Sequence, residues 1–348
     1  MKKRWVVWVL AAILVMSGSV YAQETEAVQA QEAETAQAQE TEAEGMILMD
    51  EAQIGQILDA LGNDSIRNTR QYLAEGGTIA EGYRGDAGSG LQQVLVDFGC
   101  GISIDGAVGA KTLEALHQVE AAFGLPETNE VDQTLYETLL PLDLLTKGEA
   151  DADLLEYFEK TGGPGYSDYL SACALAAQGK YYSAREAFES CSYADSSERA
   201  QNCVQEFPQS GEIWRNPDIP GSDTSLTFKV HTSDESKGRC FKMFNLDDQV
   251  VAIAFVRGSE SATVHVPAGT YHMMDGTGYE WYGSEETFGP MGYYEYLTFS
   301  EDPDTQYDAW LDYGAYELEI NATQLAEGAS SVGTSSVGWN DYLGMGNE

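Results

Sequence analysis

Two glycine-rich turns on either side of a short apolar helix pattern limit most strongly what this chain can fold into. The stretch 82–99 reads GYRGDAGSGLQQVLVDFG, and DGAVGAKT follows it at 105–112. Between the turns, apolar residues recur at i, i+3, i+4 and i+7, which predicts one apolar helical face: Leu91, Val94, Leu95 and Phe98. Glycines stand where turns and helix ends need a backbone that tolerates positive φ. The sequence therefore predicts a turn, a helix and a second turn in close succession.

Two further helix patterns follow the second turn. The apolar positions of the first are Leu113, Leu116, Val119 and Phe123. A Gly-Leu-Pro sequence at 124–126 predicts its end. Asp132 is the predicted N-cap of the next helix, and Val131 and Tyr136 are placed as a hydrophobic staple around it. Two shorter helical patterns precede these elements, and we place the whole helical unit at 46–145.

The spacing of these residues resembles the peptidoglycan-binding-like domain, a small three-helix module of bacterial wall-associated proteins. The similarity covers residues 82–140 and rests on Gly82, Gly85, Asp86, Leu91, Gln92, Gly99, Asp105, Gly106, Gly109, Thr112, Gly124 and Leu125. Two positions depart from the family pattern, because Val119-Glu120 replaces a usual Phe-Gln pair and Val108 replaces a usual Phe. The resemblance implies a three-helix fold and non-covalent binding to peptidoglycan.

A binding surface beside the glycine turns is a further implication of the resemblance. It would draw on Tyr83, Arg84, Asp86 and Asp105, with Arg84 pairing to a stem-peptide carboxylate. The same residues also have a structural interpretation, in which Asp86 caps the following helix and Arg84 is only solvated. Modules of this kind also serve as scaffolds that bind nothing. The sequence leaves these alternatives open.

The N-terminal region predicts export followed by a tether. A basic stretch at 2–4 precedes an apolar run at 5–16, and small residues stand at the −3 and −1 positions of a cleavage site after Ala22. These features predict a secretory signal peptide at 1–22. Residues 23–45 consist mainly of Gln, Glu, Thr and Ala, which predicts an acidic, disordered linker. We therefore expect a secreted protein, extracellular or associated with the cell wall, without stable membrane insertion.

The charge of the chain argues against several partners. It has 57 Asp and Glu against 18 Lys and Arg, a formal net charge of −39 at pH 7. Cleavage after Ala22 would remove three basic residues and no acidic ones, which takes the charge to −42. Such a field repels nucleic acid and anionic lipid, so we expect neither as a partner. The expected partners are peptidoglycan and an unidentified extracellular protein or glycan.

Residues 150–207 contain the pattern of a helical hairpin. The sequence YLSACALAAQGKYYSAREAF at 169–188 predicts a helix, a Gly-Lys-Tyr turn and the start of a second helix. Small alanines on both helices would let them approach closely. The segment resembles a single tetratricopeptide-type hairpin of the kind found in secreted Gram-positive proteins. A single repeat lacks the neighbours that a solenoid needs, which favours a docked spacer over a peptide-binding groove.

The periodicity changes from helical to alternating near residue 222. Short candidate strands separated by Gly and Pro turns begin with the apolar alternation of Leu226, Phe228 and Val230. This spacing predicts an antiparallel β-sandwich at 222–321. The sequence VHVPAGTY at 264–271 resembles the strand–turn–strand of secreted β-sandwich modules related to carboxypeptidase regulatory-type domains. Residues 322–348, rich in Gly and Ser, are expected to form a flexible tail.

The sequence contains no recognisable catalytic motif. His117, His231, His265 and His272 have neither His-x-x-x-His nor His-Glu-x-x-His spacing, so we predict no metal site and no cofactor. His265 and His272 flank a predicted hairpin, across which they would face each other. No Gly-x-Ser-x-Gly or Ser-x-x-Lys motif identifies a nucleophile. We therefore predict no catalytic residues and a protein that is not an enzyme.

The cysteines are too few and too scattered for a disulfide framework. They are Cys100, Cys173, Cys191, Cys203 and Cys240. Isolated buried thiols are the expected state of most of them. A bridge between Cys191 and Cys203 is the alternative that the sequence leaves open.

Two stretches have both a functional and a structural interpretation. The aromatic sequence that contains Trp281 and Tyr282 fits a glycan-stacking or partner-binding face, whereas aromatics at alternating strand positions are commonly core residues. The acidic sequence at 300–304 fits weak calcium binding but lacks the Asp-x-Asp-x-Asp-Gly order, which favours a solvated loop.

These features predict a multidomain α and β protein, with a three-helix peptidoglycan-binding-like domain, a tetratricopeptide-like helical hairpin and a C-terminal antiparallel β-sandwich. The expected function is association with the cell wall, with the β-sandwich displayed outward. An alternative is an extracellular interaction scaffold whose β-domain aromatic face binds a protein or glycan, with no wall binding. A third is a peptidoglycan hydrolase whose carboxylates are not distinguishable among so many acids.

Overall fold

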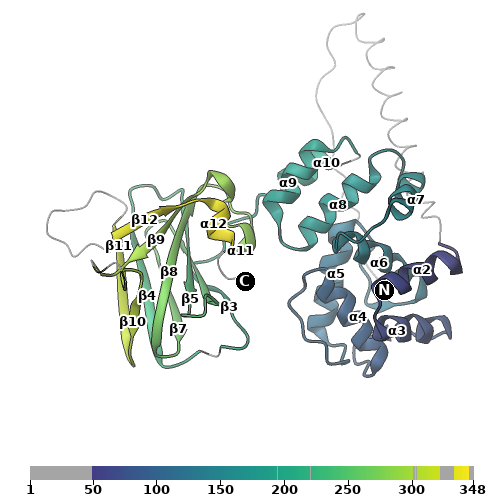
Figure 1. Cartoon of the computed structure of the whole chain (residues 1–348), viewed down its shortest axis with the longest axis horizontal. Coiled ribbons are helices and arrows are strands. Elements are labelled where there is room, and N and C mark those ends of the chain that lie inside the picture. The colour runs from purple at the N-terminus through teal and green to yellow at the C-terminus, as the bar shows by residue number, and fades with distance from the viewer. Residues whose placement is uncertain are drawn as a thin grey trace, which may run out of the picture. The chain divides into compact units, whose positions relative to one another are not determined.

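The computed structural model describes residues 49–193, 195–219, 221–300, 302, 304–321 and 333–344. The predicted signal peptide at 1–22 and linker at 23–45 lie outside the described residues, as do parts of the predicted tail. The described chain is mixed α and β, with helices before residue 203 and mainly strands after residue 210 (Figure 1).

The helical part begins with the elements that contain the glycine-rich turns. In chain order these are α2 (Glu51–Leu61), α3 (Asp64–Ala74), β1 (Ile79–Ala80), α4 (Asp86–Asp97), α5 (Ala110–Phe123), β2 (Glu130–Val131) and α6 (Gln133–Thr146). The predicted helix ends are confirmed. Asp132 caps α6 by accepting a hydrogen bond from the N–H of Leu135 at 2.8 Å, and α5 ends at Gly124, where φ is +68°.

A second group of helices follows, and it contains the predicted hairpin. These helices are α7 (Ala152–Gly162), α8 (Tyr166–Ala177), α9 (Tyr181–Ser190) and α10 (Ser196–Asn202). The chain turns between α8 and α9 at Gly179, where φ is +72°. Ala172 and Ala184 are fully buried, as close packing of the two helices requires. Among the described helices, none is both long enough and apolar enough to cross a membrane.

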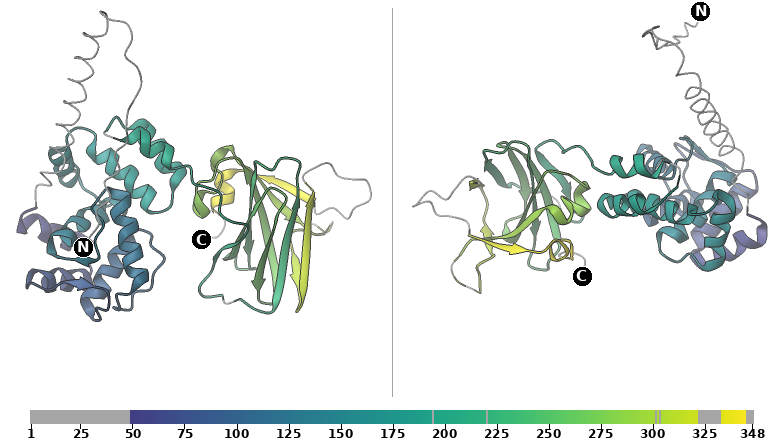
Figure 2. Two further views of the ribbon diagram at one scale, coloured as in Figure 1. Left: turned by 180° about the vertical axis from the view of Figure 1, so that it is seen from behind. Right: turned by 90° about the horizontal axis from the view of Figure 1, so that it is seen from above.

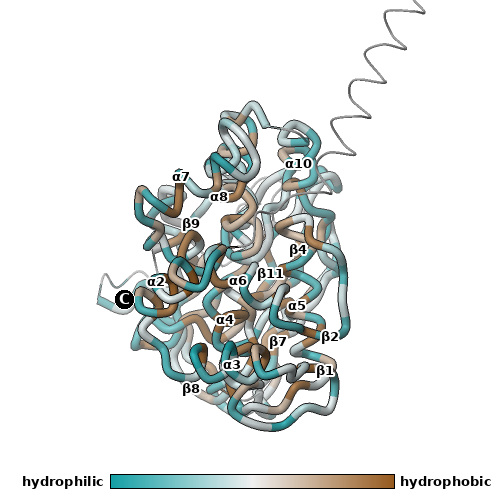
Figure 3. The backbone as a smooth tube through the Cα atoms, turned by 90° about the vertical axis from the view of Figure 1, so that its right-hand side faces the viewer, coloured by the Kyte–Doolittle hydropathy of each residue, from teal (hydrophilic) through white to brown (hydrophobic). Residues whose placement is uncertain are grey.

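One apolar core runs through all of these helices. Its buried side chains extend from Ile54 in α2 to Cys203 after α10, without a break at 145–150. Helix α8 packs against both α5 and α6. Figure 3 shows apolar residues, in brown, recurring along α4 and α6. The segments expected at 46–145 and 150–207 therefore share a core.

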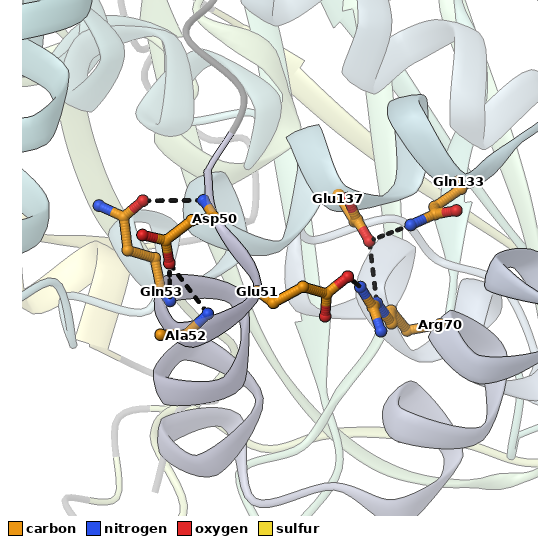
Figure 4. A network of polar contacts seen from close by, with 7 residues as sticks. All are labelled: Asp50, Glu51, Ala52, Gln53, Arg70, Gln133 and Glu137. Carbon is orange, nitrogen blue, oxygen red and sulfur yellow. Dashed lines mark hydrogen bonds and ion pairs between the residues drawn. The ribbon is translucent and has the colours of Figure 1, made fainter.

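An arginine connects three helices near the start of the described chain (Figure 4). Arg70 of α3 contacts Glu51 of α2 at 2.6 Å and Glu137 of α6 at 2.9 Å. Beside it, Asp50 forms a capping box with Gln53 at the N-terminus of α2. The two ion pairs hold α2 and α6 against α3.

The β part consists of a larger and a smaller sheet. The larger has the strand order β12-β9-β8-β5-β6-β3, with β10 also paired to β8, and the smaller has the order β11-β4-β7 (Figures 1 and 2). The strands are β3 (Gly211–Arg215), β4 (Thr224–His231), β5 (Gly238–Phe244), β6 (Val250–Arg257), β7 (Ser261–Val266), β8 (Gly269–Gly278), β9 (Tyr293–Thr298), β10 (Ala309–Leu311), β11 (Ala315–Asn321) and β12 (Gly333–Val337). Short helices α11 (Gly283–Glu286) and α12 (Trp339–Gly344) complete the part.

Two features of the sheets correct the sequence prediction. β11 pairs with β4 in parallel, although every other pairing among the described strands is antiparallel, as predicted. Residues 333–344, expected in a flexible tail, form β12, which pairs with β9, and α12, in which Tyr342 is fully buried. The Gly- and Ser-rich composition predicted a tail, because composition carries no information on pairing with β9, the strand that orders this segment.

The larger sheet has an apolar cluster on each face. One cluster fills the space between the two sheets, where Phe228 of β4 stacks on Phe241 of β5 with ring centroids 4.3 Å apart. The other lies on the opposite face, where Tyr342 of α12 packs against Tyr294 with centroids 4.4 Å apart. The larger sheet is thus covered on both sides, which explains why its central strands are almost continuously buried.

A buried carboxylate connects α9 to the segment after β8. Glu286 is 5% exposed and accepts hydrogen bonds from the backbone N–H groups of Tyr182 at 2.6 Å and Ser183 at 3.1 Å, and from the Ser183 hydroxyl. Helix α9 has no side-chain cap of its own. Glu286, 104 positions after Tyr182, therefore caps this helix and places its charge at the positive end of the helix dipole.

Replacing Glu286 by alanine should lower the free energy of unfolding by about 2 kcal/mol, because three donors lose their acceptor. Urea denaturation of the variant measures the change. The neighbouring exposed residue provides a matched control, since Glu285→Ala should cost less than about 0.5 kcal/mol. Equal losses in the two variants would contradict the capping role.

Two buried aspartates lie beside cations, one in each part. Asp143 of α6 is fully buried 3.3 Å from the amine of Lys147, which also contacts Asp97 at 2.6 Å. Asp275 of β8 is 1% exposed and lies 2.9 Å from Arg239. Burial raises the pKa of each aspartate from 3.8 to about 7, against the opposing effect of the neighbouring cation.

The raised pKa values of Asp143 and Asp275 make stability fall with rising pH. The native state holds each proton more tightly than the unfolded chain does, so each contribution declines as the pH rises from about 4 to about 7. The slope is at most about 1.4 kcal/mol per pH unit for each group. Urea titrations at about pH 5.5 and about pH 8 measure the free energy of unfolding at each pH. Asp143→Asn or Asp275→Asn should reduce the difference between these two free energies. The exposed control Asp64→Asn should leave it unchanged, and an unaltered difference in both buried variants would refute the assignment.

Candidate functional site

The structure brings the two glycine-rich turns together as a short antiparallel pair. The N–H of Val108 donates to the carbonyl oxygen of Tyr83 at 2.9 Å. Arg84 lies opposite Ala107 in an antiparallel bridge. The turn that carries three of the four predicted site residues therefore lies beside the turn that carries Asp105.

A buried glutamine holds the second turn in place. Gln92 of α4 is 2% exposed, and its Oε1 accepts hydrogen bonds from the backbone N–H groups of Asp105 at 3.0 Å and Gly106 at 2.7 Å. Its Nε2 donates to the Asp105 carboxylate at 2.9 Å and to the Thr112 hydroxyl at 3.4 Å. A single amide thus supplies both the acceptor and the donor that the turn requires.

Two glycines make this close approach of backbones possible. Gly106 has a φ of +72°, and a Cβ there would lie 2.9 Å from the carbonyl oxygen of Gly85. A Cβ on Gly88 would lie 2.6 Å from the carbonyl oxygen of Gly106. A side chain at either position would push the turns apart, so the glycines that mark the sequence are required by backbone contact.

Helices α4 and α5 begin directly after these turns, each with a glycine as its N-cap. Neither Gly85 nor Gly109 offers a side chain to the first backbone N–H groups. Asp86, expected as a possible cap, is instead the first residue of α4 and makes no capping hydrogen bond. The first turn of α5 contains no acidic residue and includes Lys111. The backbone N–H of Ala87 in α4 is hydrogen-bonded to the Tyr83 hydroxyl, whereas the first N–H groups of α5 have no side-chain cap beside the paired turns.

The four predicted residues are held in different ways. Tyr83 is half-buried against Tyr72, with ring centroids 5.5 Å apart, and burial raises the pKa of its hydroxyl. Arg84 is exposed, and its side chain forms no hydrogen bond or ion pair with another described residue. The hydrogen bond from Gln92 lowers the pKa of the exposed Asp105 carboxyl, and the nearby charge of Arg84 acts in the same direction.

An unpaired cation is unusual in this acidic chain. Most lysine and arginine side chains among the described residues contact a carboxylate. The exposed side chains that do not, within the described ranges, are Arg84, Lys111 and Lys180. Two of these three adjoin the paired turns. Exposed positive charge beside the uncapped N-terminus of α5 suits a carboxylate ligand.

Trp281 and Tyr282 are buried, which corrects the expectation of a partner-binding face at these residues. Trp281 is 5% exposed and packs edge-on against Phe255, with centroids 4.9 Å apart. Tyr282 is 2% exposed, and its hydroxyl accepts from Arg185 at 2.6 Å and donates to Glu280 at 2.6 Å. Neither ring offers a face to a ligand, because both fill space inside the fold.

Tyr279 of the same aromatic sequence is 62% exposed, and two more strongly exposed rings lie at positions that the sequence analysis did not single out. Trp310 of β10 is 72% exposed, and Tyr313 in the following turn is 80% exposed. Ala309 and Leu311 on either side of Trp310 face the core between the sheets, which turns Trp310 outward. The alternation of Ala, Trp and Leu was visible in the sequence, but it does not show which set is buried.

The histidines do not form a reactive cluster. His265 belongs to β7 in the smaller sheet and His272 to β8 in the larger one, so the two do not face each other as expected. His272 contacts Asp308 at 2.7 Å. Over the part of the chain that the structure describes, no group of three or more His, Cys, Asp and Glu side chains is placed to hold a metal ion.

All five cysteines are free, so the bridge between Cys191 and Cys203 that the sequence left open is not formed. Burial raises the pKa of Cys173 and Cys240 to about 12. A thiol with so high a pKa carries almost no thiolate at neutral pH and is a poor nucleophile.

The chain matches no protein-family model, and no curated protein sequence or solved structure is significantly similar to it. The surface formed by the paired turns, with Tyr83, Arg84, Asp86 and Asp105, is the candidate site.

Gln92→Leu should lower the free energy of unfolding by about 2 kcal/mol, because buried backbone donors at the second turn lose their acceptor. Urea denaturation measures this change. Gln118→Leu, at an exposed position of α5, is the matched control and should change stability by less than about 0.5 kcal/mol. A loss at Gln92 no larger than that at Gln118 would show that the turn does not depend on this side chain.

Proposed function

We propose that this chain is an exported, non-catalytic protein that binds peptidoglycan through the paired turns. The proposed contact residues are Tyr83, Arg84, Asp86 and Asp105. Arg84 carries the proposal, because in a chain of net charge −39 it is an exposed arginine whose side chain directly contacts no carboxylate among the described residues; it acts on Asp105 only at longer range. The resemblance of 82–140 to the peptidoglycan-binding-like domain supplies the class of ligand.

The chemistry of the surface suits the stem peptide of peptidoglycan. A guanidinium group forms two parallel hydrogen bonds with a carboxylate, and Arg84 is free to do so. Uncapped N–H groups of α5 would add further donors near the same point. The negative charge of the remaining chain is screened over about 8 Å at physiological salt, so it opposes binding mainly at close contact.

A second candidate function follows from the exposed aromatic rings of the β part. Trp310 and Tyr313 present ring faces of the kind that stack on sugars or insert into protein partners. We propose glycan or protein binding at Trp310 as the alternative to wall binding, in place of the buried Trp281 and Tyr282. If Trp310→Ala abolished the binding of a glycan or protein partner and Arg84→Ala left that binding unchanged, the result would favour this alternative.

Sedimentation with purified peptidoglycan sacculi tests the first proposal. The mature chain should sediment with sacculi, and Arg84→Ala should weaken binding about ten-fold, because a charge-assisted hydrogen bond to a carboxylate contributes about 1.5 kcal/mol. The matched control is Lys180→Ala, which removes another exposed cation without an acidic partner and should bind as the unaltered chain does. The complete mature chain is needed because the helical core continues past residue 145.

Each other outcome has a definite meaning. Sedimentation that Arg84→Ala and Lys180→Ala weaken equally would indicate general electrostatic attraction. Sedimentation of the unaltered chain that survives Arg84→Ala would place the binding surface elsewhere. Absence of sedimentation at low and physiological salt would refute wall binding and leave the paired turns a structural element.

A further inference from the structure

A cavity that is open to solvent lies between α2, the end of α6 and α7; its apolar lining is called the floor here and its carboxylates the rim. Its volume is about 90 Å³. The apolar side chains that line it are Met49, Ile57, Ala60, Leu144 and Leu154, with the ring of Tyr157. Three carboxylates complete the lining, those of Glu149, Asp151 and Asp153, together with the amides of Gln53 and Gln56. The cavity shares no residue with the paired turns, so a ligand bound in it would be independent of the proposed wall binding.

The size of the cavity selects a slender group. A cavity that holds a benzene ring has a volume of about 150 Å³, and one water molecule takes up about 30 Å³ in the liquid. A space of about 90 Å³ is smaller than that and, although it is open to solvent, fits an unbranched alkyl chain more closely than an aromatic ring. The buried side chains of Ile57, Leu144 and Leu154 provide the apolar contact that such a chain needs.

The charge of the rim selects a cation. Every charged side chain in the lining is a carboxylate, and no lysine or arginine is among the lining residues. One carboxylate oxygen of Asp151, Oδ1, already accepts a hydrogen bond from the N–H of Leu154 at 2.9 Å. Glu149 and Asp153 form no hydrogen bond or ion pair with another described residue. An ammonium group at the rim would meet two carboxylates that lack a partner within the described chain.

We propose that this cavity binds the side chain of a lysine or a similar diamino acid in a peptide. The four-carbon stem would lie on the apolar floor while the ammonium group reaches the rim, as lysine side chains commonly arrange themselves at such boundaries. The ammonium group is compact and has three donors, which Glu149, Asp153 and the amide oxygen of Gln56 can accept. A guanidinium group is planar and wider, so the small cavity favours lysine over arginine.

A matched pair of small probes tests this inference on the complete mature chain. Nα-acetyl-lysine methylamide and Nα-acetyl-norleucine methylamide have the same alkyl stem, and only the first has an ammonium group. Titrations followed by NMR should show the lysine probe binding about ten-fold more tightly than the norleucine probe, an advantage that falls as salt is added. Equal affinities of the two probes would overturn the proposal and leave a purely apolar cavity.

Variants locate the binding. Glu149→Gln combined with Asp153→Asn should remove the ten-fold preference for the lysine probe. Ala60→Met places a larger side chain in the floor and should lower the affinity for both probes. The control Glu114→Gln removes one exposed carboxylate on α5, outside the cavity, and should leave both affinities unchanged. If Glu114→Gln lowered the affinity for the lysine probe as much as the rim variants do, the effect would come from the general acidity of the chain, and the proposed site would be wrong. Failure of the lysine probe to bind at all would overturn it too.

Discussion

The surface of the helical part depends on the hydrogen bonds of one buried amide. Gln92 holds the backbone of Asp105 and Gly106 while its own position is fixed by α4, so the second turn cannot move without losing bonds in the interior. Because the turns pair with each other, this constraint also positions Arg84 opposite Ala107. The exposed residues of the candidate site are thus placed by a buried side chain of α4, which gives this loop surface the rigidity that recognition needs.

The same use of a distant polar group recurs elsewhere in the molecule. Glu286 caps α9 from the segment after β8, and Glu120, fully buried in α5, accepts hydrogen bonds from the backbone and hydroxyl of Thr128 at 3.1 and 2.7 Å. In each case a buried carboxylate accepts hydrogen bonds from partly buried backbone donors. Part of the acidic composition is therefore structural. Glu120 adds no charge to the surface, because its side chain is fully buried.

Much of the helical part could be predicted from the sequence, because its signals are local. The apolar spacing around Leu91, the cap at Asp132 and the turn at Gly179 each depend on neighbours within a few residues. The sheets were predicted less completely. Parallel pairing of β11 with β4 joins residues about 90 positions apart in the chain, and β12 gains its order from β9, so neither is visible in local periodicity.

The sequence by itself determined the acidic charge, the glycine-rich turns and the change from helical to alternating periodicity at residue 222, since each is a property of composition or of short spacing. Only the tertiary structure decided which aromatic rings meet solvent. Trp281 and Trp310 both stand in strand-like sequence, yet the first is 5% exposed and the second 72%. Burial depends on the residues that pack against each ring from distant parts of the chain, and no local pattern contains that information. For the same reason, the sequence named Arg84 as a candidate, but only the fold showed it near the uncapped N-terminus of α5 and out of direct contact with any carboxylate among the described residues.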